Sequence, residues 1–212
     1  MMGAWVSQPT LPKTRNVHDL SALSPESATA FAASCCERML PHYEAFVSDE
    51  RWGDVTPLRL ALDAVWKHIE GTRLSVEEGR RLLVHLDRVT PDTEDFDSRY
   101  VSAALDAASA IYAAVECCLG DACSHANVAA ELATDTIDMF VQVSRDLDPN
   151  DPALDSLILE DPLMVREMAK QAADLELLRH GIADEISVAR FRAGAMPDGL
   201  SSLGLRMGNA DP

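Results

Sequence analysis

The most hydrophobic stretch of the chain lies near its middle, where apolar residues recur at the three- and four-residue spacing of an α-helix. A helix that is apolar nearly all round is normally buried. We therefore predict a central buried helix near residues 98–119, ended by Gly120. Its apolar face consists of Val101, Ala104, Leu105, Ala108, Ile111, Tyr112, Val115, Cys118 and Leu119, with Ala103, Ala107, Ala110 and Ala114 on the adjacent side.

Similar periodicity covers most of the remaining chain, and capping residues mark where further helices begin. Ser24-Pro25, Thr56-Pro57 and Asp161-Pro162 each pair a capping side chain with a proline suited to the first helical position. Residues 75–78 match a capping box. The predicted helices cover 24–40, 57–70, 75–89, 98–119, 122–147 and 162–192, with a break at Pro41 and a short apolar segment at 153–159.

These elements predict an all-α fold, a helical bundle of about six to seven helices. The 212 residues, of which 47% are apolar and 25% charged, are typical of one globular domain. We expect a single bundle domain over residues 24–193, with a flexible leader at 1–23 and a disordered tail at 194–212. Apolar residues recur every seven positions along the 162–192 helix, which suits core packing or a seam against a second copy. We therefore expect a monomer or a homodimer.

Charge is distributed unevenly along the chain, whose net charge is −17. Residues 91–161 contain 16 acidic residues and only two bases, Arg99 and Arg145, so that this third carries −14 and the rest −3. A surface of this sign repels nucleic acids and anionic membranes and attracts basic proteins. We expect a basic protein partner and neither nucleic-acid nor membrane binding; solubility is the alternative explanation of the charge.

The sequence points to a cytoplasmic protein without a cofactor. No secretory signal is recognisable, and no unbroken apolar run approaches the length of a membrane span. The cysteine spacing fits neither zinc ligation nor a CxxC motif. Buried thiols in a reducing compartment are the best explanation of Cys35, Cys36, Cys117, Cys118 and Cys123.

Candidate functional side chains surround the central helix. Asp106 lies on a narrow polar strip of that helix, where burial would raise its pKa; a strip that reaches water, or a hydrogen bond from a neighbouring group, is the simpler explanation. Asp97 lies about two and a half turns earlier, so any shared site needs a second helix, supplied through Asp135 or Asp138. The regular polar spacing around Asp135 and Asp138 also fits a solvated face. The candidate binding residues are Asp97, Ser98, Asp106, Asp135 and Asp138.

Established catalytic and metal motifs are missing from the sequence. No histidine has a glutamate three positions before it, as the standard di-metal site of a helical bundle requires. The chain also lacks a G-x-S-x-G elbow, a phosphate-binding glycine loop and a concentrated basic stripe. We therefore assign no catalytic residue and no metal ligand, although an oxygen-only cation site at the four aspartates stays open.

Several short blocks resemble one bacterial family when they are taken in order. Together they resemble the YjaG-like family, a domain of unknown function, over residues 28–190. The resemblance implies an up-and-down helical bundle and brings no assigned activity. The blocks are Cys36-Glu37-Arg38-Met39 with Pro41, Tyr43 and Phe46; Trp52-Gly53-Asp54; Leu60, Leu62-Asp63, Val65 and Trp66; Glu94-Asp95-Phe96-Asp97-Ser98 with Tyr100, Ala104 and Asp106-Ala107; and Thr134-Asp135 with Asp138.

Three functional hypotheses follow from the sequence. We favour a non-enzymatic cytoplasmic helical module whose acidic surface, residues 91–161, binds a partner protein, for example as an immunity-type inhibitor of a cationic toxin. The first alternative is a metal-assisted or acid/base enzyme that uses Asp97, Asp106, Asp135 and Asp138. The second alternative is a homodimeric scaffold that associates through the 162–192 helix.

Overall fold

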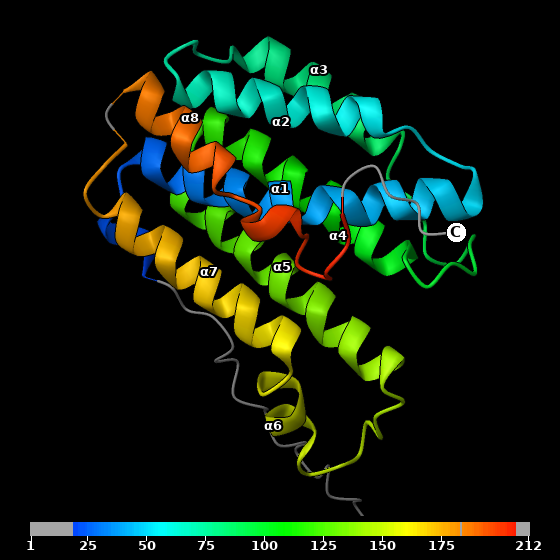
Figure 1. The fold of residues 1–212 in the computed structure, drawn as a ribbon. Coiled ribbons are helices and arrows are strands. Elements are labelled where there is room, and N and C mark those ends of the chain that lie inside the picture. The colour runs from blue at the N-terminus through cyan, green and yellow to red at the C-terminus, as the bar shows by residue number, and fades with distance from the viewer. Residues whose placement is uncertain (1–18, 183, 207–212) are drawn as a thin grey trace, which may run out of the picture.

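The fold is all-α, as the sequence predicted. The computed structural model describes residues 19–182 and 184–206, and these contain eight α-helices, two short 3₁₀ helices and no strand. Figure 1 shows the helices stacked around α1 and α4. The elements are η1 (Leu20–Ala22), α1 (Pro25–Glu50), α2 (Val55–Ile69), α3 (Val76–Asp87), α4 (Val101–Leu119), α5 (Ala122–Ser144), α6 (Leu154–Leu159), α7 (Pro162–Leu178), α8 (Glu185–Ala193) and η2 (Pro197–Gly199).

Helix α4 is the predicted central helix. It contacts α1, α2, α3 and α5, and α1 also packs on α5 and α7. Most of the buried positions of α4 are alanines, which let the backbones of neighbouring helices approach closely. The helix begins at Val101 rather than near residue 98, because Ser98 forms a turn whose carbonyl accepts from the Val101 N–H.

Helix α4 is long and apolar enough to resemble a membrane span, although its apolar run is not unbroken. Within the described residues it is the one helix long and apolar enough to cross a membrane by length and composition, and 61% of its most apolar window is buried inside the protein. Four polar residues interrupt the apolar run of α4, so the sequence shows no unbroken apolar run of membrane-spanning length there. The bundle helices around α4 account for most of its burial.

Helix α1 continues through Pro41, so the predicted break at this residue is wrong. A proline inside a helix lacks the N–H that would bond four residues back and crowds that turn. Here Pro41 is buried between neighbouring elements. The nearby carbonyl of Arg38 accepts a hydrogen bond of 3.1 Å from the Ser202 N–H. Tertiary packing therefore maintains the helix across a residue that would end it in isolation.

The predicted 162–192 helix is two helices, α7 and α8. Between them Gly181 takes a φ of 82°, a left-handed conformation that a continuous helix does not allow. The seven-residue seam is therefore interrupted, and Leu177 and Ile186 on either side are 64% and 73% exposed. The continuous seam on which the homodimer hypothesis was based is absent from the described part of this segment.

Parts of the two segments predicted to be flexible are folded. The prediction of a disordered tail is wrong over residues 194–206, where Ala195, Ser201, Ser202 and Leu203 are buried; residues 207–212 lie outside the described part. In the predicted leader, residues 1–18 lie outside the described part, whereas η1 is folded and its Leu20 is buried. The glycine and proline content of residues 194–206 thus reflects tight turns against the bundle.

Replacing a buried side chain in residues 194–206 tests this packing. Leu203 is 6% exposed and packs in a cluster with Ile137, Val141 and Met164. Leu203→Ala should lower the free energy of unfolding by about 2–4 kcal/mol, because it leaves a cavity. Leu177→Ala, at an exposed helix position, should change it by less than about 0.5 kcal/mol. Equal, small effects in urea titrations of both variants would show that the segment does not pack.

Candidate functional site

Two charged residues stand side by side in the middle of the buried helix α1. Glu37 is 7% exposed and Arg38 is 2% exposed. Charged side chains are almost never buried unless they are paired. Because consecutive residues on a helix point about 100° apart, Glu37 and Arg38 meet different neighbours.

Glu37 is bound by two arginines and a tryptophan from α2 and α8. The Arg59 guanidinium donates to both carboxylate oxygens, at 2.7 and 2.9 Å, and the Trp66 indole N–H donates at 2.8 Å. Arg192 lies 3.2 Å from the same carboxylate and bonds Asp63 at 2.5 Å. Burial works against the Arg59 charge, but the bonds to Glu37 outweigh it and raise the Arg59 pKa.

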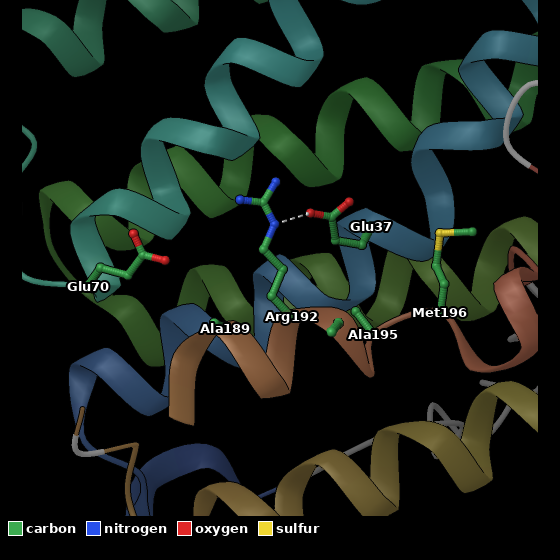
Figure 2. A pocket seen from close by; sticks show the side chains of 7 residues that line it. Glu37, Glu70, Ala189, Arg192, Ala195 and Met196 are labelled. Atoms are coloured by element: carbon green, nitrogen blue, oxygen red, sulfur yellow. Dashed lines mark ion pairs between the residues drawn. The ribbon is translucent and has the colours of Figure 1, made fainter. Parts of the chain in front are cut away.

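An open pocket of about 430 Å³ lies beside this Glu37 cluster. Figure 2 shows Arg192 between Glu70 and Glu37, with its ion pair to Glu37 drawn as a dashed line. The Arg192 guanidinium also lies over the Trp66 ring, 5.6 Å from its centre. The pocket is lined by Glu37, Glu70, Ala189, Arg192, Ala193, Ala195 and Met196. Polar and apolar groups therefore meet at one surface depression.

Arg38 points to the opposite neighbour, α7, and forms a fully buried ion pair with Glu167. Its Nε and Nη2 bond the two Glu167 oxygens at 2.8 and 2.7 Å. Its Nη1 donates to the Ser34 carbonyl and hydroxyl and lies 3.4 Å from Asp174. Burial raises the pKa of Glu167, but Arg38 outweighs that effect and holds it below its usual range.

Two facing polar stripes continue this network. On α1 the stripe is Ser34, Arg38 and His42, one turn apart; on α7 it is Glu167, Gln171 and Asp174. Ser34 donates to Asp174 at 2.8 Å, Gln171 donates to Glu167 at 3.0 Å, and Lys170 pairs with Asp174. Nearly every charge in this network is thus neutralised by an opposite charge. The network therefore has a structural role: it holds α7 against α1.

His42 and Ser202 form the end of this polar seam. The Ser202 hydroxyl lies 3.2 Å from His42 Nε2, a spacing also found between a catalytic serine and its base. Both side chains are fully buried, however, and His42 Nδ1 has no partner among the described residues. Burial lowers the His42 pKa to about 3. The pair therefore holds the C-terminal segment and lacks the orienting acid of a triad.

Asp106 is the predicted residue with the most altered environment. Burial raises its pKa to about 6, against a hydrogen bond of 2.7 Å from the Thr136 hydroxyl, while the Asp135 charge raises the pKa further. The second helix is α5, as expected: Thr136 donates the hydrogen bond, and Asp135 contributes a nearby charge. Asp106 is therefore a candidate proton-transfer group near neutral pH.

The other predicted residues have separate surroundings. Ser98 is buried and donates to Asp49 on α1 at 2.6 Å, while Asp97 is exposed. Asp135 is exposed, and Asp138 accepts from Gln142 on its own helix at 2.7 Å. In the described residues no three His, Cys, Asp or Glu side chains gather as a metal site requires. The four aspartates thus do not form an oxygen-only cation site.

A second open pocket, about 450 Å³, borders the acidic connector before α4. Its lining includes Asp87 and Asp92, and none of the five predicted binding residues contributes to it or to the pocket beside Glu37. The acidic connector therefore offers carboxylates at a shallow surface.

Glu37 and Arg38 were not among the site residues predicted from the sequence, although both belong to the first block of the family resemblance. A usable signal was present: they are the only Asp, Glu, Lys or Arg residues in 27–43. A mostly apolar helix that buries a Glu-Arg pair must find partners for both charges. On α7 the matching signal is the spacing of Glu167, Gln171 and Asp174, all on one face.

The prediction of buried thiols is confirmed for three of the five cysteines. All five are free; Cys35, Cys36 and Cys117 are buried, whereas Cys118 and Cys123 are half-buried. Burial raises the pKa of the Cys35 thiol to about 12, which disfavours the reactive thiolate.

Comparisons with known proteins extend the description to a family. A family model described as "Protein of unknown function (DUF416)" matches residues 15–206. A solved structure, a DUF416 family protein from Shewanella baltica OS155, superimposes with a TM-score of 0.81 at 24% identity, covering 91% of this chain and 100% of that one. At this identity the likeness shows the fold alone. No curated protein matches the chain.

Double-mutant analysis tests the Arg38–Glu167 pair. Arg38→Met should lower the free energy of unfolding by about 3–5 kcal/mol, because it leaves Glu167 charged and buried. Adding Glu167→Met should cost less than the sum of the two single changes. The matched control is the exposed pair Arg179–Glu176, which has the same 2.7 Å separation and whose loss should cost under about 1 kcal/mol. Equal costs at both pairs would contradict a buried structural ion pair.

Asp106 should make stability depend on pH in an unusual direction. Its folded pKa, about 6, exceeds its ordinary value, so the folded protein keeps a proton that the unfolded chain has lost between about pH 4 and 6. The contribution of Asp106 to the free energy of unfolding is fully present below pH 4 and is lost as the pH rises through 6. Asp106→Asn should therefore stabilise the protein at pH 7 by up to about 2 kcal/mol and by nothing at pH 4. Exposed Asp97→Asn is the control, and a gain that is the same at both pH values would disprove the assignment.

Proposed function

The chain belongs to the DUF416 family, whose description assigns no function. We propose that this protein is a non-enzymatic helical module that binds a basic partner protein through the acidic surface of residues 91–161. The same proposal places the module in the cytoplasm. Inhibition of a cationic toxin by an immunity-type contact is one form that it takes. The finer assignment to the YjaG-like proteins stays a prediction.

The observation that carries the proposal is the exposure of the acidic side chains. Of the 16 acidic residues in 91–161, 12 are exposed, three are half-buried and one, Asp161, is buried. The two bases do little to neutralise them: Arg145 pairs with the buried Asp161 at 2.7 Å, and Arg99 lies over the Tyr100 ring. An exposed field of one sign accelerates encounter with a partner of opposite charge.

Exposed acids gather along residues 92–97 before α4 and around α6, the short helix at the end of the bundle that lies away from α2 and α3 (Figure 1). Five exposed acids lie between the end of α5 and the start of α7: Asp146, Asp148, Asp151, Asp155 and Glu160. Large apolar side chains are exposed in the same region, with Val143 at 68%, Met139 at 52% and Leu157 at 44%. Acids around exposed apolar residues suit a partner that presents basic residues around an apolar patch.

An acid/base enzyme is the second candidate, and the raised pKa of Asp106 favours it. Of the predicted partners, Asp135 acts on Asp106 through its charge, but Asp97 is exposed and Asp138 is bonded within α5. The binding module therefore has the stronger support.

Site-directed photo-crosslinking in cells tests the binding module. A photoreactive residue at exposed Asn150, beside α6, should capture a protein that is markedly basic, and the yield should fall as salt is raised before irradiation of a lysate. The variant D146N/D148N/D151N/D155N should lose this product. Asparagine keeps the turn hydrogen bonds that Asp148 and Asp151 accept, so the variant removes charge with little change in fold.

The matched control removes the same number of charges elsewhere. E77Q/D87N/E176Q/E185Q neutralises four exposed acids outside 91–161 and should retain the crosslink. A product that is not basic, that does not weaken with salt, or that both variants lose equally would overturn the proposal.

A further inference from the structure

Helix α5 exposes one side along most of its length. It packs against α1, α4 and α7, and Figure 1 shows it running alongside α7. Its exposed side chains recur at intervals of three and four residues from residue 128 to residue 143, so they share one face of the helix. These residues span about 22 Å, or four turns, at 1.5 Å per residue. The face is therefore long enough to receive a helix of a partner.

Two pairs of apolar side chains lie on this face, and one acid separates them. Val128 is exposed and Leu132, one turn later, is half-buried. Met139 and Val143 are both exposed and are again one turn apart. The exposed Asp135 lies between the two pairs. Single exposed apolar residues are normal on a protein surface, whereas a row of them on one face is typical of a contact surface.

The charge of α5 favours a basic partner. The helix contains three acidic residues, Glu131, Asp135 and Asp138, and no lysine or arginine. At about 100° per residue, Glu131 and Asp138 flank the apolar row on the edge away from α4. The edge toward α4 is marked by Thr136, which donates to Asp106. A second copy of the chain, whose net charge is −17, would bring like charge to this face, so a cationic partner is the better occupant.

A helix suits this face better than an extended segment. An added strand needs the free edge of a sheet for its backbone hydrogen bonds, and the described residues contain no strand. A helix bonds its own backbone and presents side chains. An amphipathic helix that lies along α5 meets the two apolar pairs with residues at i, i+4, i+11 and i+15, the spacing that α5 itself uses. This order is the same from either end, so both orientations of the partner helix fit.

We propose that α5 is the part of the acidic surface that receives the basic partner, and that the partner contributes an amphipathic helix. The apolar residues of that helix lie on the two apolar pairs. A lysine or arginine midway between them meets Asp135, and further basic residues lie along the edge formed by Glu131 and Asp138. This inference rests on the proposed function and specifies the element of the partner that is recognised.

Two synthetic peptides of identical composition test this geometry by nuclear magnetic resonance of the full chain labelled at methionine methyl groups. In the first peptide, leucines occupy i, i+4, i+11 and i+15, and lysines occupy the midpoint and one flank. In the second, the same residues are rearranged so that the leucines surround the helix. The Met139 signal, identified by its loss in Met139→Leu, should shift saturably with the first peptide. The second should bind at least about tenfold more weakly, because it cannot place its leucines on both apolar pairs at once.

Variants of the chain locate the contact. V128Q/V143Q keeps good helix formers but removes one apolar residue from each pair, and it should weaken binding of the first peptide at least about tenfold. The matched control L177Q/I186Q replaces exposed apolar residues on α7 and α8 and should leave the affinity unchanged. All four positions are exposed, so the fold should persist in both variants. Asp135→Asn should weaken binding roughly twofold to fivefold, as expected for loss of one exposed ion pair.

The inference is overturned if both peptides bind with the same affinity, or if V128Q/V143Q binds the first peptide as tightly as the unaltered chain. Light scattering that shows self-association of the unaltered chain, lost in V128Q/V143Q, would make a second copy the occupant and would also overturn it. A basic, salt-sensitive crosslink at Asn150 that V128Q/V143Q retains would overturn this inference and leave the proposed function standing. A crosslinked product that is not basic would overturn the proposed function and this inference together.

Discussion

The structure depends on one constraint: two opposite charges stand on consecutive residues of α1, within a stretch, residues 27–43, that is buried throughout and contains no other Asp, Glu, Lys or Arg. Removing Glu37 and Arg38 from water costs more free energy than a typical domain can lose, unless each has close partners. Their side chains leave α1 in different directions, so they cannot simply neutralise each other. Glu37 therefore needs the arginines of α2 and α8, and Arg38 needs the acids of α7. The pair therefore holds α2, α7 and α8 against α1, whereas α4 and α5 pack on α1 through apolar side chains.

The C-terminal segment and the pocket follow from this arrangement. With α7 held on Arg38, residues 195–206 lie against α1, where Ser202 bonds the Arg38 carbonyl beside Pro41 and Arg166 donates to the Ser201 and Ser202 carbonyls. With α8 held on Glu37, its alanines face the end of α2 and leave the depression that Glu70 borders. The acidic surface around α6 lies outside both networks, which leaves it accessible to a partner.

Helical periodicity and caps predicted most of the fold because they are local signals. The capping box at Ser75 and Glu78 and the cap at Asp161 formed as the sequence indicated, and the alanine-rich central helix is buried. Errors arose where distant contacts overrode local preference. Pro41 stays helical because other elements pack around it, and residues 194–206 fold because Leu203 finds an apolar cluster. Thr56 does not cap α2 because Asp54 accepts from its N–H instead.

The candidate site was less predictable than the fold, because pairing partners lie far apart in sequence. The raised pKa of Asp106 followed from its position on an apolar helix, but the contact with Thr136 depends on how α4 meets α5. Glu167 lies 129 residues from Arg38, and no local pattern in the sequence joins them.

Hydrogen–deuterium exchange of Glu37→Gln and Arg38→Met, measured separately, tests most directly whether this charge pair holds α7 and α8 against α1. We expect Glu37→Gln to raise exchange chiefly in α8 and to leave α7 protected, whereas Arg38→Met should raise exchange in α7 and residues 195–206 and leave α2 protected. Increased exchange in the same elements for both variants, or a uniform increase throughout the bundle, would contradict this role of the charge pair.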